Sequence, residues 1–489
     1  MPAVTHEPVG AQEGSLLVRG TALADWTGAD ASRIPPGRPV EVRMTDGRIS
    51  EVGPRLPPLP GEEVLDVPGA LLLPGLHDHH LHLRALVAAR RSAAVGPDRV
   101  AGRDELAAAL RDSAVDRHGW RRAIGYHESV AGALDRWSLD ALVADGPIRV
   151  QHRSGMLWMV NSAGVDRLGL DAVDEPGVER DATGRPTGRL FRLDAWLARR
   201  LPGDDPLADV DGISRELAGR GVTGVTDATP DATFDGHIAL ADAVRRGRIR
   251  QRVHAMTPVG LEPPGPPLFS RGPHKVLLDD DRLPALDELV DVVRSAHAGG
   301  VPVAVHCVTA PQLTLALAGL ADAGALAGDR LEHASVVHPD LVGPMAALGL
   351  AVVTNPGLVH ARGDSYLEEV DERDVAHLYP CASLLRSGIA VAAGSDAPFG
   401  PVDPWTVVHA ARTRTTAGGC LLGADEAVPL VTALSLYFGR PDAPGYARRI
   451  EPGEPGDLCL LDDGVVPAAG RGDAVAATIV AGRIVYRAG

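Results

Sequence analysis

The stretch that decides the fold is Leu71–Leu83, which reads LLLPGLHDHHLHL. An apolar run ends at a Pro-Gly pair and gives way to alternating residues. In a β-strand, Asp78, His80 and His82 share one face, because side chains two positions apart point the same way. Two imidazoles on one face beside a carboxylate suit a metal ion that takes nitrogen ligands. The alternative is a histidine-rich strand end that only packs or faces solvent, so ligand-type residues elsewhere must decide.

The composition limits the class of protein. With 489 residues, the chain is long enough for one large α/β domain or for several smaller ones. Its formal net charge of −16 leaves no basic surface for a phosphate backbone, and 3% aromatic residues offer little for base stacking. We therefore expect a small-molecule substrate and no nucleic-acid partner.

Nothing in the sequence indicates export or membrane anchoring. The N-terminal stretch MPAVTHEPVGAQEG has neither a cationic nor an apolar segment. No apolar run approaches the roughly 20 residues that a membrane helix needs. We expect a cytoplasmic protein without a membrane partner. The four cysteines contain no CxxC pair, which favours a reducing compartment; they are Cys307, Cys381, Cys420 and Cys459.

Lys275 is the only lysine among the 48 lysine and arginine residues. A surface cation tolerates exchange of lysine for arginine, whereas a site that needs a primary amine does not. The alternative is that one lysine survived by chance at the surface.

Strand and helix patterns alternate through the middle of the chain. Helical patterns occur at Pro284–His297 and Gln312–Ala327, whereas the Pro- and Gly-rich segment Pro258–Pro273 is typical of a loop. Eight mostly apolar segments qualify as buried parallel strands, which favours an α/β fold with a (β/α)8 TIM-type barrel. They are Leu71–His82, Gly221–Asp227, Ile249–Met256, Lys275–Asp279, Val301–His306, Arg330–His333, Leu350–Asn355 and Ile389–Asp396.

The domain organisation follows from the remaining segments. Short β-like pieces separated by turn residues lie near both ends of the chain. We expect residues 1–70 and 440–489 to form one small discontinuous β-sandwich domain, and residues 71–439 to form the barrel. The segment at about 84–220 is too long for a single crossover, so we expect a large insertion over the barrel mouth.

Ligand-type residues fall at the ends of the predicted strands, where barrel enzymes build their active sites. Each one alone has an ordinary explanation, such as a packed histidine, a capping aspartate or a solvated lysine. Together they favour a metal-dependent catalytic site over coincidence. They are His80, His82, Lys275, His306, His333 and Asp396.

These residues lie in motifs that resemble the amidohydrolase superfamily of metal-dependent hydrolases, in its amidohydrolase 3 branch. The PG-x-x-D-x-H-x-H motif of the branch is matched at Pro74–His82, and its GSDAP motif at Gly394–Pro398. A K-x-x-x-D strand at Lys275–Asp279, a valine-rich strand ending in His306 and the Glu332-His333 pair occur in the same order.

The resemblance implies one or two divalent metal ions, with zinc first and iron or manganese as alternatives. His80 and His82 would hold the first ion together with Asp396. His306 and His333 would hold the second.

The resemblance also implies roles for three further side chains. Lys275 lies where some relatives carry a lysine carboxylated by CO2, whose carbamate bridges two ions. Asp396 would accept a proton from metal-activated water and pass it to the leaving group, while the metal and a histidine, His306 or His333, polarise the substrate carbonyl. Asp78 would orient a histidine ligand without binding the metal.

Departures from the branch pattern fall where we expect the substrate. Relatives usually have a Gly-His pair where this chain has Gly155-Met156, and a Gly-Asp pair where it has Thr309-Ala310. The substrate class is therefore less constrained than the metal ligands. The residues expected to face the substrate are Met156, Asn161, Asp279, Cys307 and Asn355.

The leading hypothesis is a hydrolase of non-peptide C–N bonds of the amide, cyclic amide, formamide or carbamate type. A metal-dependent esterase or lactonase, or a non-hydrolytic lyase or isomerase, would use the same kind of site. A non-catalytic relative is disfavoured because no expected ligand is missing. A homodimer is expected only from the frequency of closed symmetric assemblies.

Overall fold

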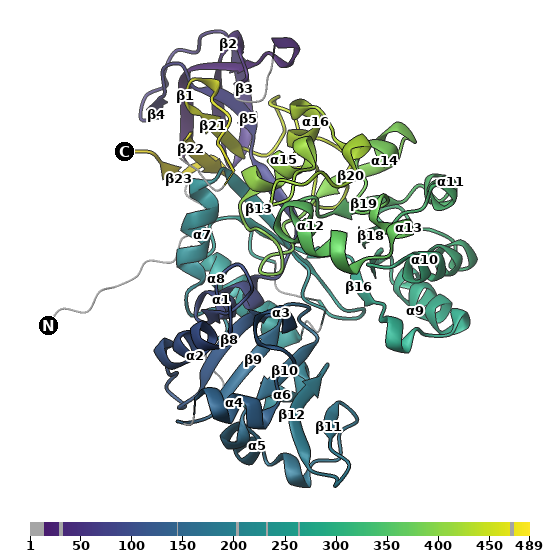
Figure 1. Cartoon of the computed structure of the whole chain (residues 1–489). Coiled ribbons are helices and arrows are strands. Elements are labelled where there is room, and N and C mark those ends of the chain that lie inside the picture. The colour runs from purple at the N-terminus through teal and green to yellow at the C-terminus, as the bar shows by residue number, and fades with distance from the viewer. Residues whose placement is uncertain are drawn as a thin grey trace, which may run out of the picture. The chain divides into compact units, whose positions relative to one another are not determined.

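The computed structural model describes residues 14–28, 33–143, 145–201, 205–230, 233–262, 265–469 and 474–489 (Figure 1). The chain divides into two compact units. The first comprises Met1–Leu83 and Asp209–Gly489, and the second is Arg84–Ala208. All six expected metal ligands belong to the first unit. In the described residues, no helix combines the length and apolar character needed to cross a membrane.

Both ends of the chain contribute to one eight-stranded sheet, whose order is β23-β22-β21-β5-β1-β2-β3 with β4 beside β1. Figure 1 shows its purple N-terminal and yellow C-terminal strands side by side. The ends join where β5 (Leu71–Pro74) pairs antiparallel with β21 (Leu458–Leu461). Because the described strands form one hydrogen-bonded sheet, the predicted β-sandwich is not confirmed. The other strands are β1 (Ser15–Ala24), β2 (Pro36–Thr45), β3 (Arg48–Gly53), β4 (Glu63–Asp66), β22 (Val475–Val480) and β23 (Arg483–Arg487).

Each of the eight predicted segments overlaps a parallel strand, and these eight strands together with β15 form two parallel sheets. Their orders are β15-β14-β13-β6 and β16-β17-β18-β19-β20. The strands read as continuous buried apolar runs because helices or loops cover both faces of a parallel sheet. Their bounds are β6 (Leu76–Leu81), β13 (Val222–Asp227), β14 (Arg252–Met256), β15 (Phe269–Gly272), β16 (His274–Leu277), β17 (Val303–Cys307), β18 (Arg330–His333), β19 (Ala351–Thr354) and β20 (Ala390–Ala393).

Strand β15 corrects one expectation, because it lies inside the segment that was read as a loop. Phe269 pairs in parallel register with Val253 of β14, so strand pairing overrides the Pro-rich composition of the segment. Pro273 then separates β15 from β16, since proline has no N–H to donate to a ladder.

The two parallel sheets approach each other at the edges formed by β20 and β6. The backbone N–H of Asp396, just after β20, donates to the carbonyl of His80 at 2.8 Å, and His82 N donates to the carbonyl of Ala397 at 2.9 Å. No closed barrel is detected in the described part of the chain, so the fold is established as α/β with two parallel sheets.

Helices follow most of the strands, as the predicted pattern requires. The predicted helices at Pro284–His297 and Gln312–Ala327 are confirmed as α9 and α10. The Thr309 side chain caps α10 by accepting a hydrogen bond from Gln312 N. The helix bounds are α8 (Phe234–Arg245), α9 (Leu286–Ala298), α10 (Ala310–Ala323), α11 (Pro339–Ala347), α12 (Gly357–Glu369) and α15 (Pro404–Thr413).

The second unit has a sheet and a core of its own. Its six strands have the order β11-β12-β10-β9-β8-β7, and Trp120 and Trp158 are buried in one of its apolar clusters. The next helix, α7 (Val210–Gly219), belongs to the first unit, where Thr478 Oγ1 donates to Ala218 O. Placement of an insertion over a barrel mouth stays a prediction. The strands are β7 (Ala93–Ala94), β8 (Arg121–Tyr126), β9 (Ile148–His152), β10 (Leu157–Val160), β11 (Val178–Arg180) and β12 (Pro186–Phe191).

Candidate metal centre

The end of β6 and the turn after β20 bring two histidines to one carboxylate. His80 is completely buried, and its Nε2 lies 3.7 Å from Oδ1 of Asp396. The Nε2 of His82 lies 3.3 Å from the same oxygen. Side chains alternate along a strand, as predicted, which explains why the rings of His80 and His82 lie on the same side of it.

His333 adds a third ring at the end of β18. Its ring centroid lies 4.6 Å from that of His80 and also 4.6 Å from that of His306, which comes from β17. His333 has a φ of +66° and Asp396 a φ of +54°, in the left-handed region that costs energy for residues other than glycine. Consecutive side chains of a regular strand point to opposite faces, so the left-handed turn at His333 lets both Glu332 and His333 face His80.

Three of these residues could hold a divalent metal ion directly. The ligand atoms of His80, His333 and Asp396 all lie within 4.8 Å of one another. The Nε2 of His80 is buried and has no hydrogen-bond partner among the described residues, which is costly for a polar atom unless a ligand satisfies it. Imidazole nitrogens with a carboxylate suit zinc, iron or manganese, so the residues present fit such an ion.

Glu332 and Arg330 hold the ring of His80, a role that the sequence pattern alone did not reveal. A carboxylate only accepts hydrogen bonds, so Nδ1 of His80 donates to Glu332 and its Nε2 keeps a lone pair for a metal. The Nε of Arg330 donates to the other oxygen of Glu332 at 2.6 Å. Arg330 and Glu332 lie two positions apart on β18, so their side chains share one face. That spacing in the sequence RLEH is the signal from which this pair could have been predicted.

Asn355 fixes the ring of His333 in the same way. The amide Nδ2 of Asn355 donates to Gly394 O at 2.9 Å, so its Oδ1 accepts from Nδ1 of His333 at 2.7 Å. Asn355, which was expected to face the substrate, is completely buried as this partner.

Asp78 is buried between two backbone segments that carry site residues, the end of β6 and the turn after β20. Its Oδ1 accepts hydrogen bonds from His80 N at 3.1 Å and from Ser395 N at 3.0 Å. Burial raises the pKa of its carboxyl group to about 6 despite these hydrogen bonds. Asp78 therefore positions backbone atoms, while the ring of His80 is held by Glu332.

Lys275 presents a buried amine to the same group of residues. Within the described part of the chain its Nζ has no hydrogen-bond partner, and the residue is 9% exposed. Burial lowers the pKa of the amine to about 8, although the charges of Glu332 and Asp396 partly oppose the shift. Burial lowers the pKa of His80, and the charge of Lys275 lowers it further. The pKa of the half-buried His306 is also lowered, mainly by burial and in part by the charge of Lys275.

Asp396 carries negative charge in this environment. Burial alone would raise the pKa of its carboxyl group, but the hydrogen bond with His82 and the nearby rings of His333 and His80 hold that pKa well below its usual range. An ionised carboxylate beside several imidazoles can bind a cation or accept a proton.

The other expected substrate-facing residues are spread over both units. Asn161 belongs to the second unit, where its Oδ1 accepts from Ile148 N and Gly164 N. Met156 precedes β10 of that unit and is half-buried. In the first unit, Cys307 ends β17 and is buried, and Asp279 accepts from Asp281 N after β16.

A second group of ligand-type residues lies in the second unit and consists of His127, Glu128 and His152. Backbone N–H groups donate to Nδ1 of His127 and to Nδ1 of His152. A neutral imidazole whose Nδ1 accepts carries its hydrogen on Nε2, and Nε2 of His152 lies 3.0 Å from the Glu128 carboxylate. These rings lack an Nε2 lone pair for a metal, so we assign no ion to this group.

Comparison with known proteins defines the class. The sequence profile of the Amidohydrolase family matches residues 63–486. The chain is 28% identical to the N-substituted formamide deformylase of Arthrobacter pascens, over 88% of this chain and 91% of that protein. It is 26% identical to the imidazolonepropionase of Caulobacter vibrioides (strain NA1000 / CB15N), over 89% of this chain and 92% of that protein.

The fold agrees with this class. An uncharacterized metal-dependent hydrolase from Pyrococcus horikoshii OT3 superposes with a TM-score of 0.73 at 19% identity, over 92% of this chain and 97% of that one. The chain therefore belongs to the Amidohydrolase family, and the resemblance in its motifs is confirmed. It is a metal-dependent hydrolase of carbon–nitrogen bonds.

Proposed function

We propose that this enzyme hydrolyses a small amide-type substrate with a non-peptide C–N bond, and that N-substituted formamides are the first class to test. The observation that carries the proposal is the convergence of His80, His333 and Asp396 around the unpartnered Nε2 of His80. The formamide deformylase from Arthrobacter pascens supports the choice of substrate, since the similarity extends over most of both chains.

Two structural inferences accompany this proposal. The eight strand positions and the hydrogen bonds at the edge between β20 and β6 support a (β/α)8 barrel. The donor set supports zinc as the first choice of metal, held by His80, His82, His306, His333 and Asp396. A divalent ion held there supplies positive charge that polarises the substrate carbonyl and makes a coordinated water more acidic.

The side chains around the metal site have different roles in the proposed reaction. Asp396 is ionised near neutral pH, so its carboxylate accepts a proton from the attacking water and returns it to the leaving nitrogen. Glu332 and Asn355 each hold the Nδ1 of one histidine, which leaves the Nε2 atoms of His80 and His333 as the ones that would hold the ion.

Lys275 would contribute through its carbamate. A neutral amine attacks CO2, forms an N–C bond and releases a proton, which leaves an N-carboxylate on the side chain. With a pKa of about 8, roughly one tenth of the amine is neutral at pH 7, and the product supplies a carboxylate that arginine cannot provide.

The test combines metal analysis with a substrate panel. Metal per chain is measured by elemental analysis of the purified protein, and formate and amine release are followed with N-substituted formamides, cyclic amides and carbamates. We expect turnover of a formamide that disappears after chelation and returns with zinc. Formamide turnover that is unaffected by complete removal of the metal would contradict the mechanism, and hydrolysis of only the other classes would contradict the choice of substrate.

A further inference from the structure

A polar cavity lies at the starts of β17 and β18, and the metal ligands lie at the other ends of these strands. It has a volume of about 370 Å³ and is lined by Val301 and Pro302, just before β17, and by Gly328 and Arg330, at the start of β18. The metal ligands His306 and His333 lie at the far ends of the same two strands. This cavity is therefore separate from the catalytic centre.

Three buried nitrogen atoms of residues that line this cavity have no hydrogen-bond partner in the part of the chain that the structure describes. They are Nε of Arg271, Nη2 of Arg330 and Nε2 of His254. The Nδ1 of His254 lies 2.9 Å from the Ser270 hydroxyl. The two arginine nitrogens can only donate, and Nε2 of His254 also donates in the tautomer whose Nδ1 accepts from that hydroxyl.

The balance of donors and acceptors favours an anion over water. A buried water satisfies such donors only by accepting their hydrogen bonds, and it then needs acceptors for its own two hydrogens. Among the described lining residues are the two cationic side chains of Arg271 and Arg330 and one carboxylate, that of the exposed Asp442. An oxyanion brings only acceptors, and its hydrogen bonds with guanidinium groups are charge-assisted.

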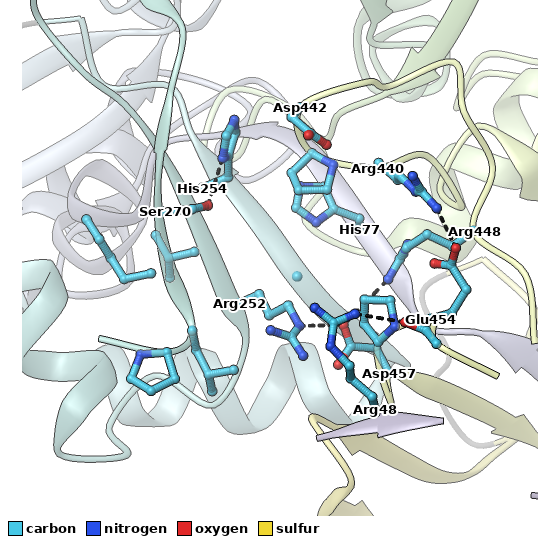
Figure 2. Close-up of a pocket in the computed structure, with 18 residues that line it drawn as sticks. Arg48, His77, Arg252, His254, Ser270, Arg440, Asp442, Arg448, Glu454 and Asp457 are labelled. Atoms are coloured by element: carbon cyan, nitrogen blue, oxygen red, sulfur yellow. Dashed lines mark hydrogen bonds and ion pairs between the residues drawn. The ribbon is translucent and has the colours of Figure 1, made fainter. Parts of the chain in front are cut away.

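The neighbouring cavity in Figure 2 provides the contrast, because its arginines already have acceptors. Arg252 Nε donates to Asp457 at 2.6 Å, and Arg440 pairs with Glu454. Arg48 donates to the carbonyl of Gly453 at 2.8 Å. This cavity also contains three carboxylates, so an anion would meet both satisfied donors and negative charge; they are Asp442, Glu454 and Asp457.

We propose that the cavity around Arg271, Arg330 and His254 binds a small oxyanion of the carboxylate, phosphate or sulfate class. These groups share the chemistry that the site requires, namely negative charge and several acceptor oxygens without a donor that needs a partner. Arg330 Nη1 contacts the carbonyl of Pro441 at 3.4 Å, and its Nε is held by Glu332, so the guanidinium is already oriented before the anion arrives.

The same guanidinium connects this cavity to the metal centre. Arg330 donates to Glu332, and Glu332 accepts from Nδ1 of His80. An anion on Nη2 offsets the positive charge of Arg330, so Glu332 attracts the Nδ1 hydrogen of His80 more strongly. His80 becomes a better electron donor, and we expect metal affinity to rise when the oxyanion site is filled.

The binding test uses sodium sulfate titrated calorimetrically into the metal-loaded protein, with sodium chloride at equal ionic strength as the reference. We expect saturable binding that Arg271→Met weakens by at least about tenfold, because a charge-assisted hydrogen bond is lost. Arg271 also pairs with the exposed Glu262, and loss of that surface pair should leave the fold intact. Arg282→Met, at an exposed arginine outside the cavity, is the matched control and should bind sulfate normally.

A further variant shows whether sulfate instead binds the metal. Asp396→Asn changes the catalytic centre only, and it should leave the sulfate affinity within about twofold of the starting value. No saturable binding, binding unchanged by Arg271→Met, or binding altered by Asp396→Asn would each overturn the site. These outcomes do not depend on which substrate the enzyme hydrolyses.

The link to His80 has a separate readout. Zinc affinity is measured by competition with a chelator, with and without saturating sulfate. We expect sulfate to tighten zinc binding by about fivefold in the unmodified chain, and to have a smaller effect in Arg271→Met at the same sulfate concentration, because less of the variant binds sulfate. An unchanged zinc affinity in the sulfate-bound, unmodified chain would overturn the link.

Discussion

The carboxylate of Glu332 is hydrogen bonded to Nδ1 of His80, and this bond joins β18 of one parallel sheet to β6 of the other. The two residues are 252 positions apart, and both side chains are completely buried. A metal-ligating histidine is commonly held by such a partner, which fixes the ring and its tautomer. The bond therefore makes the site depend on the association of the two sheets.

Replacement of Glu332 should weaken metal binding without removing a ligand. In Glu332→Gln, the amide lacks the charge that holds Arg330 and the His80 ring together, so we expect metal affinity to fall by about 10- to 100-fold. Metal content after dialysis against graded chelator concentrations measures the change. Glu368→Gln, at an exposed position of α12, is the control and should retain its metal. Equal metal retention by both variants would rule out this role for Glu332.

Asp396→Asn should separate metal binding from turnover. Asparagine cannot accept and return a proton, so we expect kcat to fall by about 10²- to 10⁴-fold. The histidine ligands remain, so most of the bound metal should remain as well. Steady-state kinetics and elemental analysis of the same preparation check both expectations, with Asp340→Asn on the exposed start of α11 as the control. An unchanged kcat would remove Asp396 as the proton acceptor.

Lys275→Arg keeps the positive charge and removes the amine. We expect metal content to decrease and activity to fall by more than about tenfold, because arginine cannot form the proposed carbamate. The chain has no other lysine, so only Lys275 and the N-terminal amine can give a carbamate signal after incubation with ¹³C-bicarbonate, and Lys275→Arg keeps the N-terminal amine. The signal of Lys275 should be present in the unmodified chain and absent from Lys275→Arg. A fully active arginine variant would exclude the carbamate.

The histidines of the second unit should not contribute to metal content. Their Nδ1 atoms accept backbone N–H groups, so His152→Ala should leave the metal-to-chain ratio unchanged. His82→Ala, within the proposed centre, should lower that ratio under the same dialysis conditions. A loss of metal from His152→Ala equal to the loss from His82→Ala would show that the second group binds an ion.

The strands and most of the proposed ligands could be predicted because their signals are local. The alternation of His80 and His82 is visible in one strand, and His306, His333 and Asp396 each stand at the end of an apolar run. Parallel strands bring such ends together, so a list of strand ends is already a list of neighbours. The single lysine was equally visible in the composition.

Other parts of the site depend on contacts that no local pattern specifies. Glu332 holds His80 only because two distant strands are placed side by side, and the left-handed φ of His333 lies in a residue type that gives no sign of it. Strand β15 was missed because pairing with β14 outweighs the turn residues around it. The second unit ends before α7 because that helix packs with the first unit, a tertiary preference that its sequence does not reveal.

Glu62 should make the stability of the terminal sheet dependent on pH. Its fully buried carboxylate accepts hydrogen bonds from Arg43, Ser15 and Leu59 N, and these contacts keep the pKa of Glu62 below its usual value although burial opposes them. A carboxyl group with a lowered folded-state pKa stabilises the fold above its unfolded-state pKa of about 4.3, and that contribution disappears as pH falls through the folded-state value.

Glu62→Gln removes the charge that pairs with the buried guanidinium of Arg43, so at pH 7 we expect the free energy of unfolding to decrease by about 1–3 kcal/mol. Denaturant unfolding of the metal-free protein measures this at a series of pH values, which keeps metal release from contributing. The difference from the unmodified chain should shrink below about pH 4, where the native carboxylate also becomes neutral. Glu63→Gln, at the adjacent exposed position, should change stability little at any pH. A Glu62→Gln deficit that stays constant down to the lowest pH would mean that packing, and not the ion pair, sets the contribution of this residue.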